Sequence, residues 1–93
     1  MKNSHKIFCN ANMLKALGNP KRLQVAYLLK SGEKKVGVLE ELLQISQSAL
    51  SQHLAVLRAA NLVATRRVAQ SVYYSLKDSK CRKLLEAIEK IYA

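Results

Sequence analysis

Hydroxyl and amide side chains are concentrated on one side of the segment between positions 46 and 60. On a helical wheel of about 100° per residue, that side carries Ser48, Ser51, Gln52, Ala55 and Arg58, with Gln47 at its edge. Amide groups can bond two atoms of a base edge at once, and small side chains permit close approach to a DNA major groove. We therefore expect Gln47 and Gln52 to read bases. The two serines would bond to bases or phosphates, and Arg58, further along the helix, would grip the phosphate backbone.

The other side of the same segment is apolar. Leu50, Leu54 and Leu57 fall together on the wheel, so we expect them to anchor the helix to a core. A helix face that is merely solvated usually carries Glu and Lys, but the strip opposite the leucines has no acid. A plain polar outer face is nevertheless an equal alternative on this segment alone. His53 lies beside the apolar half, and we expect it to have a structural role.

Basic residues outside this segment form a second group of possible anion contacts. Arg66 and Arg67 lie in a stretch rich in β-branched and aromatic residues, and Gln70 follows at the expected tip of a hairpin. We expect these three to reach phosphates or an adjacent minor groove. Lys21 and Arg22 are weaker candidates for phosphate contacts. Basic side chains in the first turn of a helix oppose its dipole, which indicates another use for them.

The whole chain is strongly cationic. Its 93 residues include 16 Lys plus Arg against 6 Asp plus Glu, a formal net charge of +10, which favours a polyanionic partner. Nucleic acid is the first interpretation and an acidic membrane surface the second. No apolar run approaches the ~20 residues of a membrane span, and no signal-peptide-like apolar segment follows the start. We therefore expect a cytoplasmic protein that does not contact a membrane.

Little in the chain suits catalysis. Asp78 is the only aspartate, the two histidines, His5 and His53, belong to separate elements, and no glycine-rich phosphate loop or acid pair is present. We expect neither enzyme activity nor a cofactor. A protein-interaction module without DNA binding is another alternative. It would predict acids or bulky apolar side chains around Ser48 and Gln52, and there are none.

Positioning these side chains requires a particular set of elements. Helical spacing, with Asn19-Pro20 and Ser46 as start signals and Asn61 as a stop signal, predicts helices over about 4–17, 20–30, 36–43, 46–60 and 79–92. Strand-type sequence predicts a two-stranded hairpin over 62–68 and 71–76. Two helices joined by a tight turn and followed by a hairpin indicate a winged helix-turn-helix, mainly α (α+β), in a single domain covering 1–93.

The chain resembles the ArsR/SmtB family of bacterial repressors in three stretches: 17–23 (LGNPKRL), 46–57 (SQSALSQHLAVL) and 72–76 (VYYSL). The motifs follow the family's order and spacing, and the likeness covers nearly the whole chain. The resemblance implies a symmetric homodimer formed by the first and last helices, which occupies double-stranded operator DNA and represses until an inducer releases it. The apolar stripe of the last helix agrees independently, because a single small domain would leave it exposed.

The sensing sites of relatives are not matched. Soft-metal sensors of the family carry a Cys-x-Cys pair. The resemblance aligns that pair with Lys35 and Gly37 of this chain, neither of which is a cysteine. Zinc sensors use an acid and histidines on the last helix, whereas residues 79–93 contain no His. Thiol sensors of the family place one cysteine in the second helix and another near the end of the last helix. The resemblance aligns these with Tyr27 and Ala93, so this pair is missing too. The resemblance therefore implies no familiar metal site.

Two thiols remain, Cys9 and Cys81, which are too few for a disulfide framework. They fall on the two helices of the expected dimer interface, with His5 one turn before Cys9. One hypothesis makes them a redox pair across the dimer or part of a thiol-rich metal site. The alternative, which we favour, makes Cys81 a small hydrophobe of the apolar stripe and Cys9 an incidental thiol.

Overall fold

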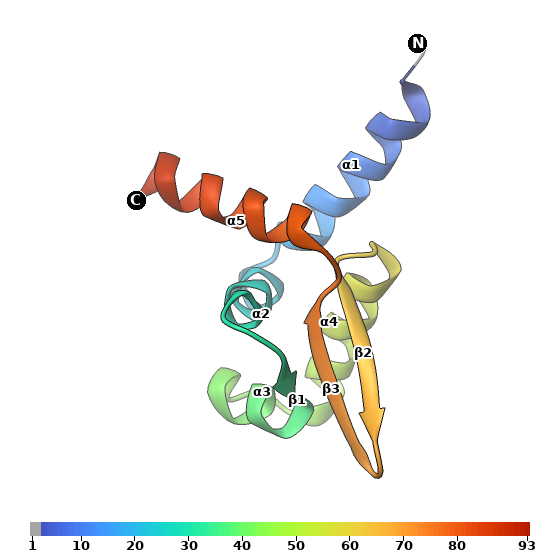
Figure 1. Ribbon diagram of the computed structural model, residues 1–93, viewed down its shortest axis with the longest axis vertical. Coiled ribbons are helices and arrows are strands. Elements are labelled where there is room, and N and C mark those ends of the chain that lie inside the picture. Colours follow the sequence, from blue (N-terminus) through green and yellow to red (C-terminus); the bar gives the residue numbers. More distant parts are fainter. Residues whose placement is uncertain (1–2) are drawn as a thin grey trace.

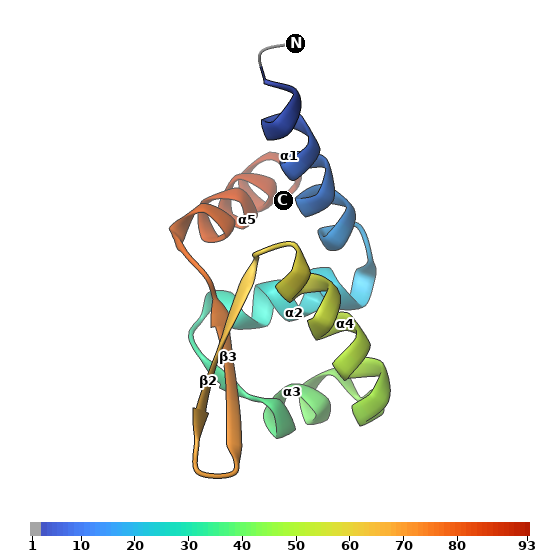
Figure 2. The ribbon, with the colours of Figure 1, turned by 90° about the vertical axis from the view of Figure 1, so that its right-hand side faces the viewer.

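The computed structural model describes residues 3–93. The elements follow the order α1 (Ser4–Leu17), α2 (Pro20–Lys30), β1 (Lys34–Lys35), α3 (Val36–Leu43), α4 (Gln47–Ala59), β2 (Val63–Val68), β3 (Ser71–Leu76) and α5 (Ser79–Tyr92). All five predicted helices and both predicted hairpin strands are present, so the winged helix-turn-helix prediction is confirmed. Figures 1 and 2 show α1 and α5 at one end of the molecule and the β2–β3 hairpin projecting at the other.

Local hydrogen bonds define the ends of the helices that carry the site. The Asn19 side chain accepts bonds from the backbone N–H groups of Lys21 and Arg22, at 2.9 and 3.1 Å, and so starts α2. The Ser46 hydroxyl accepts a bond from a first-turn N–H of α4 at 3.2 Å. Asn61 adopts the left-handed conformation, with φ of 60°, just after α4 ends. These features set where α2 and α4 begin and where α4 ends.

The sheet has one strand more than the sequence predicted. The strand order is β1-β3-β2, with β1 antiparallel to β3 in the register Lys34↔Tyr74 and Lys35↔Tyr73. Two lysines give neither an alternating pattern nor strand-type composition, which explains why β1 was missed. We call residues 63–76 the wing, comprising β2, a two-residue turn and β3. Ala69 in that turn has φ of 54°.

One apolar core joins the helices to the base of the wing. Helix α2 lies at its centre and packs against α1, α3, α4, α5 and β3. The largest fully buried side chains are Val25, Leu29, Leu39, Leu50, Leu57 and Leu85. Because α4 contributes Leu50 and Leu57 to this core, its opposite face is held outward.

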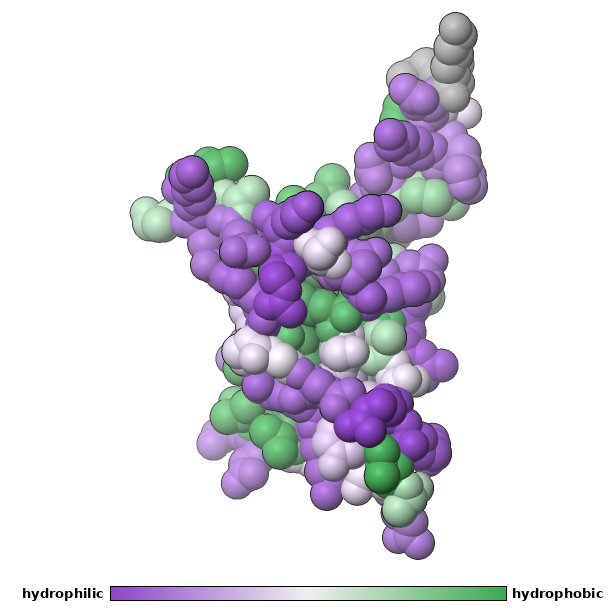
Figure 3. All heavy atoms as spheres, viewed as in Figure 1, coloured by the Kyte–Doolittle hydropathy of each residue, from purple (hydrophilic) through white to green (hydrophobic). Residues whose placement is uncertain are grey.

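Helices α1 and α5 leave apolar side chains uncovered in a single chain. Only Ala16 and Leu17 of α1 are buried, whereas Phe8 is 64% exposed and Ile91 is 72% exposed. Figure 3 shows hydrophobic residues at the free end of α5 on a mainly hydrophilic face. Among residues 3–93, no helix is both long and apolar enough to cross a lipid bilayer.

Candidate nucleic-acid interface

The outer face of α4 is open to solvent. All five predicted contact residues on this helix are exposed: Gln47, Ser48, Ser51, Gln52 and Arg58. On the opposite side, Leu50, Leu54 and Leu57 are at most 2% exposed. The hydrogen-bonding groups of the strip therefore face outward while the leucines hold the helix in place. The strip has the orientation that a groove-reading helix needs.

A groove of about 580 Å³ lies between α4 and the wing, and residues 35–40 contribute to its lining. Figure 2 shows α4 and the hairpin diverging from the base of β2, with α3 between their far ends. We call this groove the α4–wing groove. Its polar and charged lining residues are Lys35, Glu40, Gln47, Ser51, Arg58, Thr65, Arg67, Gln70, Ser71 and Tyr74. It thus brings together five residues predicted separately from two distant parts of the sequence. With three cations and one acid among these side chains, the groove suits an anionic backbone.

Strand alternation divides the two wing arginines between opposite faces of the sheet. The directly paired residues Thr65 and Tyr74 line the α4–wing groove, as does Arg67. Arg66 pairs with Tyr73 in the next row, so both point to the other face. There the guanidinium of Arg66 donates two bonds to the Glu33 carboxylate, from Nε at 3.0 Å and Nη2 at 2.7 Å. Only Arg67 of the pair belongs to the groove.

The Glu33–Arg66 contact shifts the protonation of both groups. Hydrogen bonding to the Arg66 guanidinium lowers the pKa of the Glu33 carboxyl. The same bond, with the nearby negative charge, raises the pKa of Arg66. Both side chains are charged at neutral pH, and as pH falls through the lowered pKa of Glu33 the ion pair is lost. No local pattern predicts this partner, because Glu33 stands 33 positions from Arg66 along the chain.

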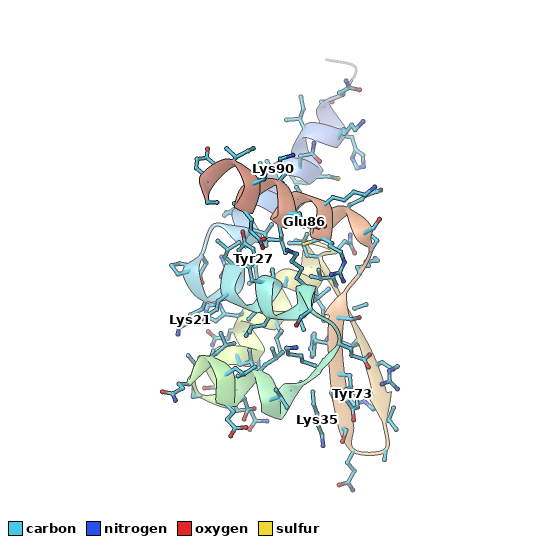
Figure 4. The ribbon with its side chains drawn as sticks, turned by 60° about the vertical axis from the view of Figure 1, so that its left-hand side comes forward. Lys21, Tyr27, Lys35, Tyr73, Glu86 and Lys90 are labelled. Atoms are coloured by element: carbon cyan, nitrogen blue, oxygen red, sulfur yellow. The ribbon has the colours of Figure 1, made fainter. Side chains whose placement is uncertain are left out.

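Lys21 and Arg22, the two weaker phosphate candidates, lie outside the α4–wing groove. Lys21 Nζ donates to the Leu43 carbonyl at 3.2 Å, and Figure 4 shows Lys21 at the edge away from the wing. Arg22 Nε donates to the Ala16 carbonyl at 2.6 Å. Its Nη1 lies 3.4 Å from Nδ1 of half-buried His53, in agreement with a structural role for that histidine. In the single chain both cations therefore bond to backbone carbonyls of the protein itself, and the phosphate contact expected for them stays a prediction.

The two cysteines lie in different environments. Cys9 is exposed, with its sulfur 3.7 Å from Nε2 of His5. Cys81 is only 3% exposed, and burial, followed by the nearby Asp78 charge, raises the pKa of its thiol. A buried thiol with a raised pKa is a poor nucleophile, which supports the structural interpretation of Cys81. No group of three or more His, Cys, Asp or Glu side chains within residues 3–93 is arranged to hold a metal ion.

Three known proteins are similar to this chain, one in sequence and two in structure. The nodulation protein NolR of Rhizobium meliloti is 50% identical over 88% of this chain and 67% of its own length. The structure of HlyU from Vibrio cholerae matches with a TM-score of 0.89 at 40% identity, covering 96% of this chain and 97% of that one. The homodimeric winged helix-turn-helix DNA-binding domain of Mb0332 from Mycobacterium bovis, described as a possible ArsR-family regulator, matches with a TM-score of 0.92 at 25% identity. That match covers 98% of this chain and 84% of the other.

The family itself is shown by the helical centre of the fold. Residues 19–65 match the model of the bacterial regulatory protein arsR family. That range begins at the Asn19 cap and ends in β2, so it contains all of α4. The chain belongs to the ArsR family of bacterial regulatory proteins.

Proposed function

We propose that this chain is a cytoplasmic transcriptional repressor that binds double-stranded operator DNA as a homodimer. The observation that carries the proposal is the α4–wing groove, where the acid-free face of α4 and the inner face of the wing meet. A helix of this kind fits the major groove, and a hairpin beside it reaches the flanking backbone or minor groove. A dimer seated on an operator would block transcription until an inducer weakens its binding.

The groove and the exposed face of α4 beside it both supply proposed contacts. Ser48 and Gln52 belong to that exposed face and do not line the groove. Gln47 and Gln52 project from the exposed face of α4 and would bond to base edges. The Ser48 hydroxyl lies 3.3 Å from that of Ser46, beside the N-terminus of α4, and it suits a phosphate contact there. Arg58 and Arg67 line the groove from its two sides and would neutralise phosphates.

The wing tip and the remaining α4 serine complete the contacts. Gln70 is exposed at the turn between β2 and β3 and would follow the minor groove. Ser51 is exposed and lines the same groove, so its hydroxyl would bond to a base or a phosphate. We assign no DNA contact to Arg22, because its guanidinium already bonds within the protein.

The proposed dimer forms through α1 and α5. Phe8 and Leu14 on α1, with Ile91 and Tyr92 on α5, are each more than half exposed in the single chain. Burying a side chain of this kind stabilises a protein or complex by roughly 1.5–3 kcal/mol. We therefore propose that a second copy of the chain covers these side chains. Two-fold symmetry would then present two α4 helices to half-sites about 34–36 Å apart.

The DNA experiment begins with a palindromic duplex selected from a random library. Arg58 and Arg67 line each groove, so a dimer offers four phosphate-contacting cations. At about 0.9 per phosphate neutralised, the slope of log affinity against log salt should be roughly −3.6. Affinity should then fall about a hundredfold or more between 50 and 200 mM salt. A flat salt response would refute the proposed DNA contacts.

The dimer is tested with Phe8→Lys, measured by sedimentation velocity. A charge at this exposed apolar position should convert dimer to monomer and weaken operator binding, because the two half-sites are no longer held together. Lys83→Ala, at an exposed cation of α5, serves as the control and should remain dimeric. If Phe8→Lys also stays dimeric, the interface lies elsewhere.

A further inference from the structure

Arg66 is bound on both sides by side chains of the protein itself. Its guanidinium forms the two-bond contact with Glu33, at 3.0 and 2.7 Å. The guanidinium carbon also lies 4.8 Å from the centre of the Tyr73 ring, within range of a cation–π interaction. A planar fork that bonds to a carboxylate with two hydrogen bonds is fixed in orientation as well as position. We call Glu33, Arg66 and Tyr73 the wing clamp.

The wing clamp lies on the face of the sheet that does not line the α4–wing groove. Tyr73 is the partner of Arg66 in the β2–β3 ladder and of Lys35 in the β1–β3 ladder. Figure 4 shows Tyr73 and Lys35 close together at the wing. Because Arg67 follows Arg66 directly, it points to the opposite face and lines the groove. Any rotation of the wing about its base therefore moves Arg67 relative to α4.

Glu33 is itself held to the body of the protein. It follows Gly32, whose φ of 139° is a conformation that only glycine adopts easily. Just before this turn, Lys30 forms an ion pair with Glu89 of α5, at 3.0 Å. Arg82 of α5 donates a hydrogen bond to the Lys30 carbonyl. Glu33 thus stands at the end of a turn tied to α5, and it is a fixed point against which the wing is held.

The outer half of the wing has few other restraints. From Thr65 to Gln70, every residue is exposed, and β1 pairs with β3 at only two positions, Tyr73 and Tyr74. A hairpin without such a contact is free to swing, and ordering it on binding would cost affinity. The clamp removes part of that cost before DNA arrives.

We propose that the wing clamp sets the angle of the wing for DNA binding, and that Arg66 is a positioning residue rather than a phosphate contact. This inference rests on the proposed function, because it concerns how the same groove is presented. It assigns a role in DNA binding to Glu33, an acid that never touches DNA. It also replaces the expectation that both wing arginines contact phosphates.

The test compares Glu33→Gln, Arg66→Lys, Arg66→Gln and the double variant Glu33→Gln/Arg66→Gln on the selected duplex. A positioning role predicts that each single variant binds about threefold more weakly, in line with the modest energy of an exposed pair. The double variant should bind DNA no more weakly than Glu33→Gln alone or Arg66→Gln alone. Each of these changes already removes the Glu33–Arg66 interaction, so combining them removes nothing more. The salt slope should stay at the wild-type value in all four.

A phosphate contact by Arg66 predicts a different pattern. Glu33→Gln would then bind as tightly as wild type or more tightly, since an acid beside the DNA is removed. Arg66→Lys would keep its charge and most of its affinity, whereas Arg66→Gln would make the slope of the dimer shallower by about 1.8, or 0.9 for each protomer. Undiminished binding by Glu33→Gln, or a shallower salt slope for Arg66→Gln, would overturn the proposal.

Two further measurements keep the outcomes distinct. Amide hydrogen exchange of the free protein should be faster at residues 65–72 in Glu33→Gln than in wild type, and equal rates would also overturn the proposal. Binding of a scrambled duplex should weaken by a similar factor in Glu33→Gln, because the wing carries Arg67 to the phosphate backbone of either duplex. If the wild-type protein fails to bind any duplex, the proposed function fails, whereas wild-type binding with unaffected clamp variants refutes the clamp alone.

Discussion

Replacing Arg67 by alanine removes the one wing arginine that lines the α4–wing groove. Its side chain is exposed and forms neither of the two ion pairs found among residues 3–93. The neighbouring cation, Arg66, forms an ion pair with Glu33. The whole charge of Arg67 is therefore available to a phosphate, and its loss should appear in full in the binding of DNA.

The size of the effect follows from counterion release. A dimer carries two copies of Arg67, so Arg67→Ala should make the salt slope shallower by about 1.8, or 0.9 for each contact. Between 50 and 200 mM salt, this change should shrink the affinity gap between wild type and variant about 12-fold. The loss should be similar for specific and scrambled duplexes, because a phosphate contact carries no sequence information.

The assay is fluorescence anisotropy of a labelled duplex at four or more salt concentrations. Lys80→Ala is the matched control, since it removes an exposed cation at the start of α5, away from the groove. The control should keep the wild-type slope. An Arg67→Ala slope equal to that of wild type, or a loss confined to the specific duplex, would refute the assignment of Arg67 to the DNA backbone.

Four further predictions concern the base-reading strip, the core and the two cysteines. Gln52→Ala should reduce the preference for the selected duplex over single-base variants by roughly 1–3 kcal/mol, and competition binding would contradict the role of Gln52 if that preference stayed unchanged. Leu57→Ala, at a fully buried position, should lower the free energy of unfolding, measured in urea, by roughly 2–5 kcal/mol. Val56→Ala, at a 40% exposed position, is the control and should lower it far less. Equal losses would show that α4 is not anchored by its leucines. At pH 8, iodoacetamide should modify exposed Cys9 well before buried Cys81. Burial raises the pKa of the Cys81 thiol above its ordinary value of 9.0. Stability should therefore fall as pH rises above about 9, where the unfolded thiol ionises first, and Cys81→Ala should flatten that fall.

The helices were predictable because their ends carry local chemical signals. Asn19 before Pro20, Ser46 before α4 and Asn61 after it are caps whose side chains or backbone act within a few residues. The exposed strip of α4 was predictable for a similar reason, since helical spacing alone separates Gln52 from Leu54. Strand β1 was not predictable, because its two lysines become a strand only by pairing with distant Tyr73 and Tyr74.

The cations of the site show where local reasoning stops. Strand alternation sends the adjacent Arg66 and Arg67 to opposite faces of the sheet. Only the packing of the wing decides which arginine lines the groove and which one meets Glu33. Arg22 is likewise a basic residue that, from the sequence alone, is a candidate for a phosphate contact. Its actual partners, the Ala16 carbonyl and His53, belong to α1 and α4, so the tertiary arrangement of three helices decides its role.

The most direct test of the central claim is a map of backbone amide shifts in the isotope-labelled protein as the selected duplex is added. The account predicts the largest changes at residues 47–58 of α4 and 67–70 of the wing, with much smaller ones across α1 and α5. Changes confined to residues 4–17 and 79–92, with α4 unaffected, would contradict it.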